Sequence, residues 1–91
     1  MSAVEGPVAA EMRARLAAAL APARLIITDD SAAHLGHAGH DAHGESHFTV
    51  EIAAAALGSL SRVAQQRAVY AALGDLMTSR IHALVIKASG V

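Results

Sequence analysis

A strand with one buried face is the feature that most constrains this chain. In the run His47–Ile52, large apolar side chains occupy every second position, and polar side chains fill the positions between them. Because neighbouring side chains of a strand point to opposite faces, this alternation predicts one buried face and one open face. We therefore expect an α+β protein whose helices pack on one face of its sheet.

The residues before this strand predict one helix and one strand. Apolar residues recur at every fourth position between Val8 and Leu20, which gives a helix one apolar face. Pro7 suits the first turn of that helix, and Pro22 stops it because a proline disfavours helical geometry in the preceding residue. The β-branched run over 25–28 then predicts a strand that ends in a turn.

The residues after it predict a short helical turn over 53–57, a longer helix and a final strand. Ser59 or Ser61 can cap the longer helix, whose apolar face continues to Met77. The last strand, over 81–88, follows a helical crossover, so we expect it to lie parallel to a neighbour. The predicted order is α-β-β-α-α-β, with a three-stranded mixed sheet.

Length leaves room for a single domain. Ninety-one residues can bury one modest core, so we expect one domain over 1–91, with fraying at 1–6 and 89–91. So small a domain has little space for a deep substrate cleft, and we expect no enzyme. No signal peptide is recognisable and no apolar run approaches the roughly 18 residues of a membrane span, which makes the cytoplasm the expected location.

A long loop over 31–46 holds most of the histidine of the chain. Four of the six histidines stand three residues apart in it, among three glycines: His34, His37, His40 and His43. Neutral imidazole suits Zn, Co, Ni and Fe, and glycines let a loop fold several rings around one ion. The chain has no cysteine, so it offers no thiolate ligand. The loop alone therefore predicts a mononuclear metal site, and a solvated loop that binds nothing is the alternative.

The other two histidines lie at strand positions. His47 opens the alternating strand on its outward face. We expect His82 in the last strand, on the same face as Leu84 and Ile86. Taken alone, His82 is interpreted as a structural histidine that hydrogen-bonds to the backbone. It gains a metal-binding role only if the fold brings it to the loop.

Four short motifs follow one another along nearly the whole chain, roughly over residues 8–88. They are Asp30–His34, Gly44–Val50, Arg67–Leu73 and Ile81–Leu84. In order and spacing, the series resembles the BolA family. This resemblance implies a fold like a type II KH domain.

The resemblance also implies a heterodimer with a monothiol glutaredoxin that shares a [2Fe–2S] cluster. In such a complex the glutaredoxin supplies its cysteine and a bound glutathione, and this chain would supply His34 and His82. The less certain candidates are His37, His40, His43 and His47. The implied role is iron sensing (iron homeostasis) or cluster trafficking, and a homodimer of the lone chain stays open.

The main alternative function is that of a DNA-binding transcriptional regulator, a role that the resemblance to BolA-like proteins also implies. It would act through a helix-turn-helix-like segment over 59–80, with four basic residues facing phosphate: Arg62, Arg67, Arg80 and Lys87. The formal net charge of −1 and the lack of any Lys/Arg run argue against this role. A solvated face is the other interpretation of these charges.

A metalloenzyme is the third function class. Asp41 or Glu45 would have to serve as its base. Catalytic zinc needs about three fixed protein ligands in an oriented surrounding, and a glycine-rich loop preorganises ligands poorly. The sequence therefore disfavours this class.

Overall fold

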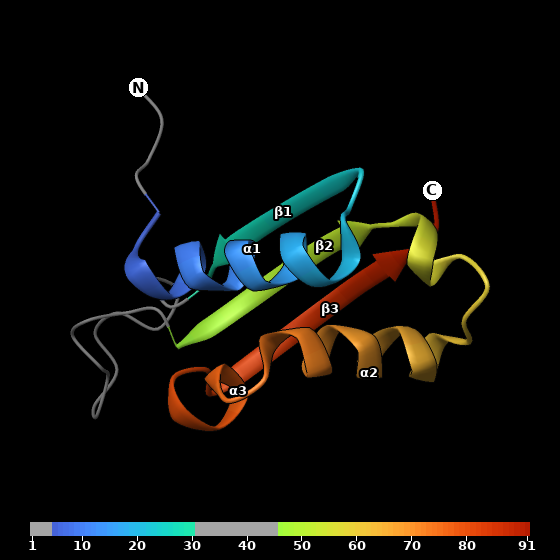
Figure 1. Ribbon diagram of the computed structural model, residues 1–91. Helices are drawn as coiled ribbons and strands as arrows, with labels where there is room; N and C mark the ends of the chain where they lie inside the picture. Colours follow the sequence, from blue (N-terminus) through green and yellow to red (C-terminus); the bar gives the residue numbers. More distant parts are fainter. Residues whose placement is uncertain (1–4, 31–45) are drawn as a thin grey trace.

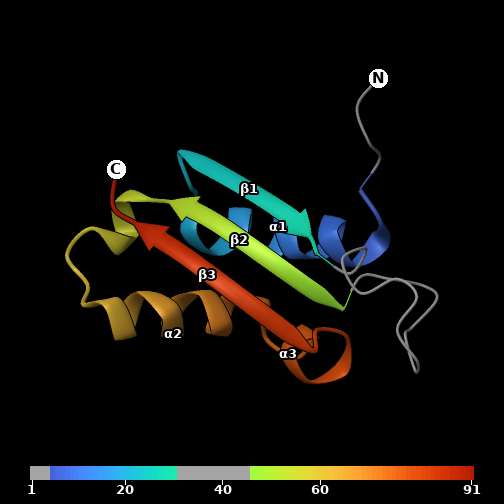
Figure 2. The same cartoon turned by 180° about the vertical axis from the view of Figure 1, so that it is seen from behind.

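The computed structural model describes residues 5–30 and 46–91, and these residues form a three-stranded sheet with helices on one face (Figures 1 and 2). β1 is antiparallel to β2, and β2 is parallel to β3, so β2 lies in the centre. This confirms the predicted α+β fold and its mixed sheet. The elements are α1 (Pro7–Leu20), β1 (Arg24–Asp29), β2 (His47–Ala53), η2 (Ala55–Leu57), α2 (Arg62–Leu73), α3 (Leu76–Ser79) and β3 (Ala83–Ser89).

The core lies between β2 and the helices. Buried and half-buried residues alternate strictly along β2, and Phe48, Val50 and Ile52 are the buried ones. They pack with Met12 and Leu16 of α1, both fully buried. The opposite face of the sheet carries no helix among the described residues, as Figure 2 shows. The predicted division into a covered and an open face is therefore confirmed.

The helix boundaries follow the expected local signals with one exception. Pro7 opens α1, and the Ser61 hydroxyl caps α2 by accepting from the Ala64 amide. The exception is Gly74, where the predicted continuous helix ends and is followed by the four residues of α3. The backbone of Gly74 has φ +55° and ψ −129°, a region that side chains strongly disfavour. None of the described helices is both long and apolar enough to cross a membrane.

The C-terminal end closes the sheet. Ser89, the first of the residues for which the sequence predicts fraying, pairs with Ala53 as the last residue of β3, and its carbonyl accepts from the Ala54 amide. Next to it, the backbone of Gly90 lies against Gly58, where an added Cβ would stand 2.5 Å from the Gly58 Cα. Two glycines thus let η2 and the end of β3 meet backbone to backbone.

Two backbone positions predict stability changes of opposite sign. Gly74→Ala should lower the free energy of unfolding by about 1–3 kcal/mol, because its conformation is strained for any side chain. Ala21 ends α1 at φ 44°, so Ala21→Gly should raise the free energy of unfolding by about 0.5–1 kcal/mol by relieving that strain. Urea denaturation of the wild type and of the two variants measures both changes in the free energy of unfolding. A loss of stability in Ala21→Gly would contradict the assignment of strain at this residue.

Candidate functional site

Ser46 joins the start of β2 to the start of β3. Its side chain is buried, and its carbonyl oxygen accepts hydrogen bonds from two consecutive amides, those of His82 at 2.7 Å and Ala83 at 3.1 Å. A carbonyl oxygen has two lone pairs, so one residue can hold both amides. The backbone that enters β3 is thereby tied to the residue that precedes His47.

The two described histidines lie side by side at this junction. The ring centres of His47 and His82 are 6.1 Å apart, with the ring planes at 72°. The Nδ1 atom of His47 is 2.8 Å from the Ser46 hydroxyl. His47 is half-buried on the open face, as predicted, and His82 is exposed. The fold therefore brings together two histidines separated by 34 intervening residues.

The prediction that His82 shares a face with Leu84 and Ile86 is wrong. His82 lies in a bend that precedes β3, so the alternation of the strand does not set its direction. Leu84 and Ile86 are half-buried against the core, whereas the ring of His82 approaches His47. The Ile81 side chain, buried directly before the bend, takes the inward position instead.

The predicted loop ligands fall outside the described residues: His34, His37, His40 and His43. The structure does describe the two anchors of that loop. Ser46 is one, and the other is Asp30, whose amide donates to the His47 carbonyl at 2.7 Å. Both anchors lie beside the histidine pair. Within residues 5–30 and 46–91, no group of three potential ligand side chains from His, Cys, Asp and Glu gathers as a metal site.

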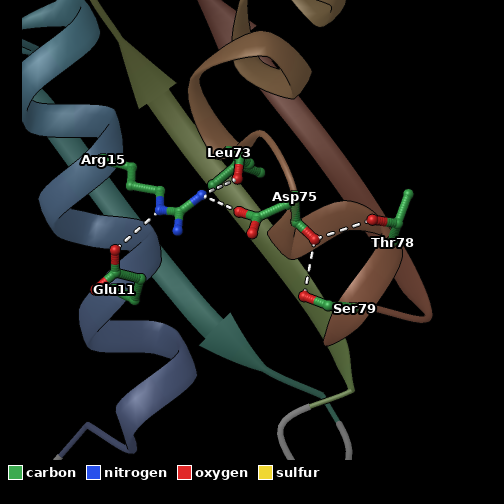
Figure 3. Close-up of polar contacts among 6 residues, drawn as sticks. All are labelled: Glu11, Arg15, Leu73, Asp75, Thr78 and Ser79. Atoms are coloured by element: carbon green, nitrogen blue, oxygen red, sulfur yellow. Dashed lines mark hydrogen bonds and ion pairs between the residues drawn. The ribbon is translucent and has the colours of Figure 1, made fainter.

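Arg15 fastens the corner between α2 and α3 to α1, as Figure 3 shows. Its guanidinium donates to the Glu11 carboxylate at 2.9 Å within α1. Across 58 and 60 residues of sequence, it also donates to the Leu73 carbonyl at 2.8 Å and the Asp75 carboxylate at 2.7 Å. The hydrogen bond from Arg15 holds the pKa of Asp75 below its usual value of 3.8.

The same corner leads the chain to His82. The Asp75 carbonyl accepts from the hydroxyls of Thr78 at 3.1 Å and Ser79 at 2.8 Å, which closes the single turn of α3 (Figure 3). The Ile81 amide then donates to the Leu76 carbonyl at 2.9 Å. The corner that Arg15 ties to α1 is thus the segment that leads into Ile81 and His82.

Of the four basic residues predicted to face phosphate, two line one cavity. Arg62 and Lys87 line a cavity of about 330 Å³ beside the start of α2 and the end of β3. Arg67 and Arg80 do not line this cavity. The cavity also contains Arg24 and Glu51, whose charged atoms are 4.0 Å apart. Sequence analysis missed Arg24, because only the strand register places it near Lys87. Moreover, α3 has only four residues and is too short for a recognition helix.

Comparison with known proteins points to one family. The family model of BolA-like proteins matches residues 16–90. Mouse BolA-like protein 1 is 36% identical over 87 residues, which cover 96% of this chain and 61% of the mouse protein. This chain therefore spans about three fifths of the length of that relative.

Solved structures agree in fold. The BolA domain of SufE1 from Arabidopsis thaliana superimposes with a TM-score of 0.83 at 36% identity, over 96% of this chain and 95% of that one. The solution structure of BolA1 from Mus musculus gives a TM-score of 0.79 at 32% identity, over 99% of this chain and 70% of that one.

The Arg15–Asp75 pair predicts a pH dependence of stability. The folded pKa of Asp75 is lower than the unfolded one, so this pair stabilises the fold at neutral pH and ceases to do so as pH falls through the folded pKa. Asp75→Asn should therefore unfold at lower urea concentration than the wild type at pH 7. The difference should shrink below about pH 4 and vanish once Asp75 is protonated.

Arg15→Gln is the matched control for this prediction. In its background, Asp75→Asn should change stability much less, because the partner is already gone. If Asp75→Asn lowers the stability of the Arg15→Gln variant as much as it lowers that of the wild type, the ion pair is not the cause of the loss.

Proposed function

The chain belongs to the family of BolA-like proteins, and from this premise we propose that it is a binding module that shares a [2Fe–2S] cluster with a monothiol glutaredoxin. In this role it serves iron sensing or cluster trafficking and catalyses no reaction itself. The ligands from this chain are His82 and His34, and the partner contributes its cysteine and glutathione.

The position of His82 is the observation that carries this proposal. His82 is exposed, yet its own amide is held by the buried Ser46. An exposed ligand on a fixed backbone can reach a group that lies between two proteins without rearrangement of the fold. His82 also stands beside both anchors of the histidine-rich loop.

Chain length supports a loop ligand at the same place. His34 follows Asp30 by four residues, which can span at most about 14 Å. Asp30 is hydrogen-bonded to the backbone of His47, next to the histidine pair. His34 is therefore within reach of a group bound at His82. The other loop histidines are also within reach of one anchor, and the family resemblance singles out His34 among them.

The chemistry of the donors suits a shared cluster. Imidazole is a known replacement for thiolate on an iron of a [2Fe–2S] centre, where it raises the reduction potential. This chain has no cysteine, so histidine is the nitrogen ligand that it can offer in place of a thiolate. The cluster would supply the iron that is sensed or transferred, and His82 and His34 would be the two residues of this chain that hold it.

Co-expression with a monothiol glutaredoxin tests this function. The wild-type chain should form a heterodimer with the visible absorption and circular dichroism of a [2Fe–2S] cluster. His82→Ala and His34→Ala should each lower the yield of that cluster by at least about tenfold, because each removes a ligand.

His40→Ala is the matched control, since it removes an imidazole from the same loop without removing an assigned ligand. Failure of the wild type to form a coloured heterodimer would overturn the function. A cluster spectrum that survives both His82→Ala and His34→Ala would overturn the ligand assignment.

The cavity beside α2 and β3 favours nucleic-acid binding as a second function. Arg24, Arg62 and Lys87 place three cations around one cavity that contains a single carboxylate, that of Glu51. Such a local excess of positive charge attracts phosphate even in a chain whose net charge is −1. This function would rest on the cavity and not on a helix-turn-helix.

Gel retardation with duplex DNA tests the second function. Arg62→Gln and Lys87→Gln should each weaken binding and reduce the salt slope by about one. Arg67→Gln and Arg80→Gln are the controls, because neither residue lines the cavity. If low salt gives no retardation, this function is excluded.

A further inference from the structure

The outer edge of β3 carries backbone groups that no neighbouring strand uses. β3 is an outer strand of the sheet, with β2 on one side only. The Ala83 amide and the Ser89 carbonyl both bond to the residues that flank β2. Because successive residues of a strand direct their backbone groups to opposite sides, every second residue from Ala83 to Ser89 faces β2 and the others face away. The N–H and C=O groups of Ile86 and Ala88 therefore point to the outer edge.

These edge groups open into the cavity beside α2. Within residues 5–30 and 46–91, no hydrogen bond reaches the outward N–H or C=O of Ile86 or Ala88. Both residues line the cavity of about 330 Å³, whose volume lies within the range of ligand-binding cavities, about 300–1,000 Å³. Unpaired groups on a strand edge are a template for one more strand. The cavity thus offers main-chain hydrogen bonds to an occupant.

The same cavity carries an excess of positive charge. Lys87 lies between the two edge residues, and Arg62 is the first residue of α2, which begins beside the C-terminal end of β3 (Figures 1 and 2). In the described part of the chain, neither cation has an ion-pair partner, whereas Arg24 lies 4.0 Å from the Glu51 carboxylate. Two uncompensated cations beside an unpaired strand edge favour an occupant that carries carboxylates.

A peptide suits both features of the cavity, and a phosphate backbone suits only one. Phosphate oxygens accept hydrogen bonds and attract the cations, but they cannot donate to the carbonyls of Ile86 and Ala88. An extended peptide presents N–H and C=O groups in alternation with the spacing of a strand edge. Its acidic side chains can meet Arg62 and Lys87 at the same time.

We propose that this cavity receives an extended acidic segment of another protein, which pairs with β3 as a fourth strand. Main-chain hydrogen bonds to Ile86 and Ala88 hold the segment, and Arg62 and Lys87 select its carboxylates. The cavity lies at the opposite end of the parallel strands from His47 and His82, so the segment and the shared cluster can be bound together. DNA needs the same cations, so the segment and DNA exclude each other.

Hydrogen exchange followed by NMR tests the added strand. The probe is a six-residue peptide of alternating Asp and Val, blocked at both ends. With saturating peptide, the amides of Ile86 and Ala88 should exchange at least about tenfold more slowly, because each gains a hydrogen bond. The amides of Val85 and Lys87 face β2 in the free chain and serve as internal controls. Unchanged exchange at Ile86 and Ala88 would overturn the proposal, as would the absence of peptide binding.

Charge variants test the preference for carboxylates. Arg62→Gln and Lys87→Gln should each weaken peptide binding about two- to fivefold, because each removes one ion pair near the surface. Arg67→Gln and Arg80→Gln are the controls, since neither residue lines the cavity. The same peptide with Asn in place of Asp should bind more weakly to the wild type. Equal affinity for the two peptides would contradict an acidic occupant.

Ala88→Pro tests the edge itself. Proline removes the outward N–H of this residue without removing a hydrogen bond to β2, so peptide affinity should fall about two- to tenfold. Far-UV circular dichroism and an unchanged yield of heterodimeric cluster with glutaredoxin confirm that the variant is folded. Undiminished peptide affinity in the folded variant would refute pairing with β3. Retardation of duplex DNA without any peptide binding would assign the cavity to nucleic acid instead. The peptide titrations use neither iron nor glutaredoxin, so their failure and the failure of cluster formation are distinguishable.

Discussion

The parallel pairing of β2 with β3 is the interaction on which the rest of the structure depends. It runs over seven residues of each strand, from His47 opposite Ala83 to Ala53 opposite Ser89. Parallel neighbours cannot be joined by a tight turn, so the chain between them has to cross one face of the sheet. That crossing contains η2, α2 and α3, and it brings Val69 and Leu73 to the core. One pairing thus determines both which face is covered and where His82 enters the sheet.

The core also determines the direction of His47. Because strand side chains alternate, a slip of one residue in β2 would turn Phe48 to the open face and Glu51 towards the helices. Phe48 is 1% exposed in the observed register, so the slip would expose its ring, and burial of the unpaired Glu51 carboxylate among the helices would cost several kcal/mol. The packing of Phe48 therefore holds its neighbour His47 on the open face, although His47 makes no contribution to the buried core.

Local patterns predicted most of the fold, because they report on elements one at a time. The alternation in β2, the proline that opens α1 and the cap at Ser61 each act within a few residues. Contacts between distant residues leave no such signal. The hydrogen bond from Arg15 to Asp75, 60 residues apart, depends on how α1 packs beside the end of α2. The contact between the rings of His47 and His82 could likewise not be predicted from the sequence. It depends on the bend before β3, which sets the direction of the His82 side chain.

The end of the sheet that carries His47 and His82 offers too few ligands among the described residues to hold a metal centre without further donors. This is a physical reason why a metal centre there would be shared with a second protein. The described residues provide two imidazoles there and no third ligand, so any metal group has to complete its coordination from the loop, from water or from another protein. Each imidazole that replaces a thiolate on an iron–sulfur cluster removes one negative charge. Less charge means a smaller desolvation penalty when the cluster is enclosed between two proteins. In the complex that we propose, a chain with histidine and no cysteine would therefore cover a cluster whose thiolates come from its partner.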